Sequence, residues 1–166
     1  RLTSARLGAG RGQPAQITSV DKAVAFAAER LERLASQGGT IGLVYSAQTT
    51  NEALFALSQV AAKLAAKGAN VRSYVTGTAA RPERADKILR SADTNPNTAG
   101  AKFLAGASAG DANALLSDLK GGKLKGLWMV GADLPVGEQA QFELAPLVDG
   151  LELFVCQAVQ DSPLLR

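Results

Sequence analysis

Two short polar runs in the chain carry the residue types that could bind a ligand. The run SAQTTNE (46–52) offers hydroxyls and an amide at the start of an expected helix, and GADLP (131–135) offers a glycine and a carboxylate. A helix N-terminus can hold an anion, a glycine allows close backbone approach, and an aspartate can accept hydrogen bonds from a sugar or base. The candidate ligand-binding residues are Ser46, Gln48, Thr50, Gly131 and Asp133.

The spacing of these residues leaves a purely structural alternative open. Neither run is a G-x-G-x-x-G fingerprint or a P-loop, the two glycine-rich patterns that bind dinucleotides and phosphates. Thr49 or Thr50 could cap the following helix, and Gly131 could form a turn.

Catalytic and metal-binding chemistry is restricted by what the chain lacks. It has no histidine and a single cysteine, Cys156. This excludes an internal disulfide, a cysteine-ligated cluster, Ser-His-Asp or Cys-His catalysis and ordinary zinc catalysis. Asp133 and Asp161 have no nucleophile to pair with, and Cys156 lies in an apolar run that indicates a buried thiol. We therefore expect no catalytic residue and no metal ligand set.

The composition of the 166 residues, 46% hydrophobic and 20% charged, is that of a single globular domain. No apolar run approaches the roughly 18 residues that span a membrane, so we expect no direct membrane insertion. The net charge is +3, with eleven Lys and Arg against five acids in residues 63–125. These cations are spaced singly without interleaved aromatics, which favours a solvated surface over a nucleic-acid interface. The only Met is Met129, so we expect a piece of a longer chain.

The order of the expected elements predicts an α/β fold. Residues 1–16 are expected to be an extended segment, and residues 17–166 a single α/β domain. Apolar runs predict buried strands, and helical periodicity with caps predicts the helices between them. The expected strands are 41–47, 70–76, 124–132 and 151–159. One expected helix follows Thr18 and Ser19, either of which can cap it, a second is capped by Thr49 or Thr50, and three more cover 81–92, 111–120 and 138–148. Alternation of this kind predicts an open, doubly wound, mainly parallel sheet with helices on both faces, of the Rossmann-like type.

The stretch SADTNPNTAGA (91–101) is rich in turn-forming residues. Pro96 disfavours helix at Asn95, while Asn97 and Gly100 favour a turn. We expect a structural turn that ends the 81–92 helix, and not a ligand-binding loop.

Five segments, in order, resemble the molybdopterin oxidoreductase family. RLTSARL with ITSVDKAVAFAAERL is similar to the family's "RLT-P-L … W-x-E-A-L" start, and IGLVYSAQTTNEALFALSQVAAKL to its "G-S-x-x-T-N-E" strand, loop and helix. LKGLWMVGADLP resembles the strand that ends in "G-x-N-P" or "G-x-D-L", and ELFVCQAVQDSPLLR the strand before an "ADVVLP" run. Within the family, ILRSADTNPNTAGAKFLA resembles the "ADKNPN-x-x-G" segment of the large iron–sulfur subunit of the NADH-quinone oxidoreductases, the respiratory complex I type.

The resemblance implies a scaffold domain of the iron–sulfur subunit, with the molybdopterin oxidoreductase fold but no cofactor in this part. Iron–sulfur clusters are then expected elsewhere in the full-length protein. The implied partners are other domains and subunits of a respiratory complex, at the cytoplasmic, peripheral side of the inner membrane. The alternative is a pterin-dinucleotide-binding fragment of a formate-dehydrogenase-like molybdenum oxidoreductase. In that case Ser46, Gln48, Thr50, Gly131 and Asp133 would contact phosphates or guanine.

Overall fold

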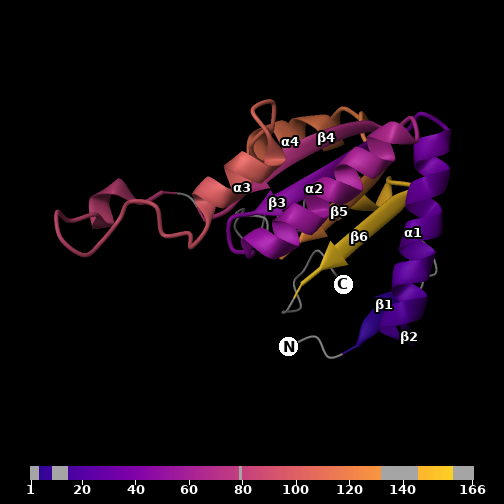
Figure 1. Ribbon diagram of the computed structural model, residues 1–166, viewed down its shortest axis with the longest axis horizontal. Helices are drawn as coiled ribbons and strands as arrows, with labels where there is room; N and C mark the ends of the chain where they lie inside the picture. Colours follow the sequence, from indigo (N-terminus) through magenta and orange to yellow (C-terminus); the bar gives the residue numbers. More distant parts are fainter. Residues whose placement is uncertain (1–3, 9–14, 79, 132–145, 159–166) are drawn as a thin grey trace.

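The protein is built on a four-stranded parallel sheet with strand order β4-β3-β5-β6, flanked by helices (Figure 1). The computed structural model describes residues 4–8, 15–78, 80–131 and 146–158. The strands are β3 (Thr40–Ser46), β4 (Asn70–Thr76), β5 (Gly126–Val130) and β6 (Leu153–Gln157). The helices are α1 (Val20–Ser36), α2 (Asn51–Ala66), α3 (Thr98–Ala105) and α4 (Ala112–Lys120), with a 3-10 turn, η1 (Pro82–Arg84). The predicted α/β class and parallel sheet are confirmed, with strand bounds within two residues of those expected.

The N-terminal residues form a small ribbon beside α1. Strand β1 (Ala5–Leu7) pairs antiparallel with β2 (Gln16–Thr18) and contacts α1. The boundary expected after residue 16 therefore falls inside β2. None of the helices in the described part of the chain is long and apolar enough to cross a membrane.

Two hydrophobic clusters cover the two faces of the sheet. The first joins β3 to α1, α2 and α3, and Tyr45, 1% exposed, lies in it. The second joins Val44 and Met129 to α4 and to the segment before β6. Trp128 is half-buried against the first cluster, and Cys156, expected to be buried, is half-buried against the second. Helices therefore cover both faces, as the alternating elements predict.

The helix starts follow the expected caps. The Ser19 hydroxyl accepts a hydrogen bond from Lys22 N (3.3 Å) at the start of α1, and the Thr50 hydroxyl accepts one from Ala53 N (3.4 Å) at the start of α2. Gly38 and Gly68, with φ of 71° and 102°, adopt left-handed conformations just after α1 and α2.

The helix expected over 81–92 is wrong. Only η1 is helical there, and Ala85 is already extended, with ψ of 142°. The Asp86 carboxylate accepts hydrogen bonds from three backbone N–H groups, those of Ile88, Leu89 and Arg90. These N–H groups would otherwise bond to carbonyls one turn earlier, so the aspartate replaces the helix with a local turn.

The turn expected at Gly100 is also wrong, because this glycine lies inside α3. A Cβ at this position would overlap the amide oxygens of Asn51 and Asn97. The glycine is therefore required by close packing and not by a turn conformation. Most of the helix expected over 138–148 lies outside the described residues. The part that is described is helical, over 146–149.

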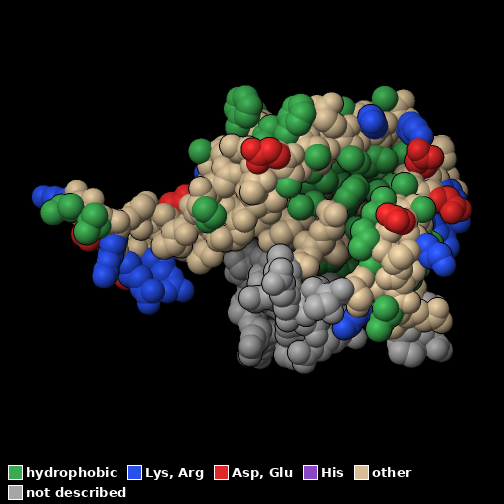
Figure 2. Space-filling view, turned by 60° about the horizontal axis from the view of Figure 1, so that its bottom comes forward, with side chains coloured by type: hydrophobic (Ala, Val, Ile, Leu, Met, Phe, Trp, Pro, Cys, Tyr) green, Lys and Arg blue, Asp and Glu red, His purple; other side chains and the backbone are tan. Residues whose placement is uncertain are grey.

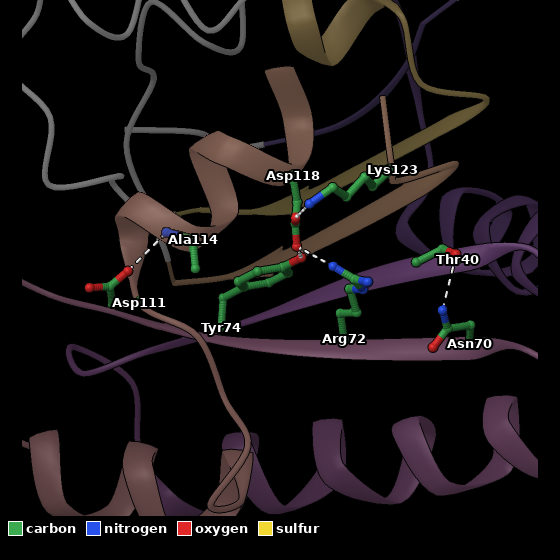
Figure 3. A network of polar contacts seen from close by, with 8 residues as sticks. All are labelled: Thr40, Asn70, Arg72, Tyr74, Asp111, Ala114, Asp118 and Lys123. Carbon is green, nitrogen blue, oxygen red and sulfur yellow. Dashed lines mark hydrogen bonds and ion pairs between the residues drawn. The ribbon is translucent and has the colours of Figure 1, made fainter. Parts of the chain in front are cut away.

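A buried carboxylate fixes α4 to β4 (Figure 3). Asp118, 8% exposed, accepts hydrogen bonds from the Tyr74 hydroxyl (2.7 Å) and from Arg72 Nη1 (2.6 Å) through Oδ2, and from Lys123 Nζ (2.9 Å) through Oδ1. The Tyr74 hydroxyl and then the Lys123 ammonium lower the pKa of Asp118. Burial, followed by the Asp118 carboxylate, raises the pKa of Tyr74. The pair is therefore an ionised carboxylate and a neutral phenol across the neutral pH range.

We expect Asp118→Asn to lower the free energy of unfolding by about 1.5–3 kcal/mol at pH 7, the range for hydrogen bonds to a charged group. A carboxylate whose pKa is lowered by folding stabilises the protein above its unfolded pKa, near 3.9, and loses this effect as the pH falls. The difference between wild type and variant should therefore shrink below about pH 4. Urea unfolding at pH 7 and pH 3 measures it.

Glu32→Gln is the matched control, because Glu32 pairs with Lys67 at the same 2.6 Å but is 61% exposed. Its loss should cost less than about 1 kcal/mol. Equal losses for the two variants would contradict the role assigned to Asp118.

Candidate functional site

The strand order places the candidate site at the carboxyl ends of β3 and β5. The chain passes from β3 to β4 on one side, and β5 then pairs with the opposite edge of β3. In open α/β sheets, ligands bind outside the carboxyl ends of the strands at such a reversal of direction. The loop after β3 and the glycine after β5 meet at this point.

The structure brings three of the five predicted binding residues to this edge. Ser46 is the last residue of β3, Gln48 lies two residues beyond it, and Gly131 directly follows β5. Thr50 is the N-cap of α2, so its oxygen is used within the helix. Asp133 lies outside the described residues.

Thr49 and Gly131 bring the two loops into direct contact. The Thr49 hydroxyl donates to Val130 O at 3.3 Å, and a Cβ on Gly131 would overlap that same hydroxyl. Gly131 N donates to Gln157 O at 2.7 Å, and its φ of 66° is in the left-handed region. The missing side chain at Gly131 therefore makes room for the Thr49 side chain.

Asn95 connects the loop after β3 with the segment after β4. Its Oδ1 accepts hydrogen bonds from Gln48 Nε2 (2.8 Å) and Thr78 N (2.7 Å). Its Nδ2 donates to Thr78 O (2.9 Å) and Asp93 Oδ1 (2.8 Å). The amide thus pairs with both backbone groups of Thr78, as a neighbouring strand would.

Asn97 also binds the loop after β3, at residues closer to the start of α2. Its Nδ2 donates to Thr49 O (2.8 Å) and Asn51 Oδ1 (2.9 Å), and its backbone N–H donates to Ala47 O (3.0 Å). We call Asn95 and Asn97 with these partners the asparagine clamp. The sequence patterns did not mark these two as site residues, and the signal available for them was the N-P-N spacing, which indicates only a turn.

A small cavity of about 130 Å³ lies beside the clamp, at the end of β4. Its lining includes Thr76 and Asn95. Thr76 is 3% exposed, and its hydroxyl has no hydrogen-bond partner within the described part of the chain. This space suffices for a few water molecules at about 30 Å³ each, and a water could satisfy the hydroxyl.

The charge next to this cavity is negative. The backbone N–H of Asn95, then the side chains of Thr98 and Asn95, lower the pKa of Asp93. An ionised carboxylate beside the start of α3 already occupies the favourable position for an anion there. The cavity therefore favours water or a neutral polar group over a phosphate.

No group of three or more His, Cys, Asp or Glu residues that could hold a metal ion occurs within residues 4–8, 15–78, 80–131 and 146–158. Three acids in this part have structural roles. Asp111 caps α4, Asp86 forms the turn after η1, and Asp118 fixes α4 to β4.

We expect Gly100→Ala to destabilise the protein, although the same change inside an ordinary helix stabilises by about 0.5–1 kcal/mol. The added methyl group would displace the amides of Asn51 and Asn97 and so open the asparagine clamp. Thermal unfolding of the variant measures the sign of the effect.

The double variant Gly100→Ala/Asn51→Ala tests the cause, because it removes one of the two overlapping amides. It should lose less stability than the sum of the two single changes. Additive losses would show that the overlap does not determine the role of Gly100.

Comparisons of the chain with protein-family models, with curated proteins and with solved structures give no match. The resemblance to the molybdopterin oxidoreductases, and the function that it implies, therefore rest on the sequence segments and stay a prediction.

Proposed function

We propose that this chain is a non-catalytic scaffold domain of the molybdopterin oxidoreductase type, in the large iron–sulfur subunit of an NADH-quinone oxidoreductase. Its role is positional. It offers a rigid α/β surface to other domains and subunits of the respiratory complex, on the cytoplasmic, peripheral side of the inner membrane. Electrons pass from NADH to quinone through iron–sulfur clusters held elsewhere in the complex.

The asparagine clamp is the observation that carries this proposal. The motif that indicates the large iron–sulfur subunit, ADTNPN followed by a glycine, contains Asn95, Asn97 and Gly100. In the structure the two amides bind backbone and side chains of the protein, and the glycine leaves room for the Asn97 amide. A motif whose polar groups bind the chain itself supports a structural role for this edge of the sheet.

The residues at the strand reversal support the same role. Ser46 Oγ accepts a hydrogen bond from Gln48 N (3.2 Å), and the Gln48 amide donates to Asn95. The Thr50 hydroxyl caps α2. A dinucleotide would have to compete with these internal bonds for the groups that recognise it.

The second candidate is a pterin-dinucleotide-binding domain of a molybdenum oxidoreductase. The observation that favours it is the meeting of Ser46, Gln48 and Gly131 at the strand reversal, where α/β proteins bind nucleotides. In this alternative these three residues, together with Thr50 and Asp133, would contact phosphates or guanine.

Metal and pterin analysis of the full-length protein separates the two candidates. For the scaffold we expect iron and acid-labile sulfide, without molybdenum, tungsten or pterin. Stoichiometric molybdenum or tungsten with pterin would contradict the scaffold and support the molybdenum enzyme.

Isothermal titration calorimetry of the 166-residue chain with GMP tests directly whether the strand reversal binds a nucleotide. We expect no saturable binding up to millimolar GMP, because the polar groups at this edge bind one another. The control is Gln48→Ala, which releases the Asn95 oxygen from one partner. Saturable binding by wild type that Gln48→Ala weakens would contradict the scaffold proposal.

A further inference from the structure

A polar arm stands away from the body of the protein between β4 and α3 (Figure 1). We define the arm as residues 80–91, and every one of them is exposed. Ile88 and Leu89, 87% and 88% exposed, lie within it. Figure 2 shows hydrophobic side chains near the far end of this projection, with Lys and Arg side chains along it. An adjacent pair of exposed aliphatic residues on a projection indicates an interaction surface.

The arm has an ordered internal structure. Arg81 N donates to Ala92 O (2.8 Å) at its base, and Asp86 N donates to Arg90 O (3.0 Å) across its turn. The Asp86 carboxylate also accepts from Ile88 N (2.8 Å) and Leu89 N (2.6 Å). These bonds fix the backbone that presents the two aliphatic side chains, which lowers the entropy cost of binding them.

An apolar groove of about 470 Å³ lies between α2 and α3 on the same molecule. Two aromatic residues flank it, Phe55 on α2 at 55% exposure and Phe103 on α3 at 85% exposure. Gly100 adds no side chain to the lining, and the Asn51 amide packs closely against it. The lining residues are Asn51, Phe55, Ala99, Gly100, Phe103 and Leu104.

The charges around the arm and the groove are complementary. The arm carries Arg81, Arg84, Lys87 and Arg90 against Glu83 and Asp86, and the Asp86 carboxylate is engaged in its own turn. The groove has Glu52 beside it, one residue from Asn51 and one helical turn before Phe55.

Glu52 is ionised and exposed. The backbone at the start of α2, and then the Thr50 hydroxyl, lower the pKa of Glu52. Within the described residues no cation pairs with it. Lys102, on the α3 side, acts instead on the Asp93 carboxylate.

We propose that the arm of one copy of this chain binds the α2–α3 groove of a second copy, with Ile88 and Leu89 between Phe55 and Phe103. Both halves of the contact are on the same chain, and the arm leads into α3, which forms one wall of the groove. Two copies can therefore exchange arms about a twofold axis and close the assembly. This inference goes beyond the proposed scaffold role and does not depend on it.

Sedimentation equilibrium of the 166-residue chain over about 1–200 μM tests the proposal, a range that spans micromolar dimers. We expect a reversible equilibrium between one and two copies. Leu89→Asp in the arm and Phe103→Asp in the groove should each weaken the dimer at least about ten-fold, as loss of a central apolar contact does. Val24→Asp is the control, because Val24 on α1 is 57% exposed but lies in neither surface. It should leave the dimer unchanged.

A mixture of the two variants gives the sharpest result. A homodimer of either variant lacks both intact contacts. A mixed pair keeps one, formed by the unchanged arm of Phe103→Asp and the unchanged groove of Leu89→Asp. The mixture should therefore associate at least about ten-fold more tightly than either variant alone.

Three results would overturn the proposal. The first is a wild-type chain that stays monomeric over the whole range, including one that instead binds vesicles of anionic phospholipid through the arm. The second is a Val24→Asp variant whose dimer is weakened as much as those of Leu89→Asp and Phe103→Asp. The third is a mixture of these last two variants that associates no more tightly than either alone. Far-UV circular dichroism confirms that each variant is folded, which we expect because all three side chains are exposed.

Discussion

The burial of β3 on both faces is the constraint on which the rest of the structure depends. Every residue from Ile41 to Ala47 is buried, so neither face of this strand can be left to water. Its two edges are also occupied, by β4 and β5. Helices must therefore cover both faces, and the carboxyl end of β3 becomes the point where loops from both neighbouring strands converge. The candidate site lies there for this reason.

At that convergence the protein uses short amide and hydroxyl side chains in place of backbone pairing. Parallel strands end without a hairpin to satisfy their last N–H and C=O groups, and unpaired buried groups are costly. Asn95 pairs with both backbone groups of Thr78, and Thr49 donates to Val130 O. The same polar residue types suit a ligand site, but a group that satisfies the end of a strand has less capacity left for a ligand.

The sequence predicted those parts of the fold that depend on local patterns. Apolar runs located all four strands of the main sheet, and the pairs Thr18/Ser19 and Thr49/Thr50 marked the starts of α1 and α2, where Ser19 and Thr50 are the caps. It failed where one side chain decides between two local structures. Helical periodicity could not show that Asp86 would take three N–H groups, nor could composition show that Gly100 packs against Asn51 from another helix. Ser46, Gln48 and Gly131 were expected at the ends of strands and lie there, but Gln48 and Gly131 bind partners far along the chain, Asn95 and Gln157.

The arm and the two asparagines of the clamp belong to the same segment, between β4 and α3. The clamp holds the end of residues 91–97 against β3 and β4, so the chain between Thr78 and Asn95 must leave the body and return to nearly the same place. Asn95 binds Thr78 directly, and residues 80–91, which lie between them in the chain, are all exposed and project outward (Figure 1). The internal bonds that occupy the candidate site thereby also create the most exposed hydrophobic residues of the described chain. Among the described residues, Gln48, Asn95 and Asn97 bind other groups of the protein at the carboxyl edge of the sheet, whereas the aliphatic side chains of the arm and the two phenylalanines of the groove are exposed.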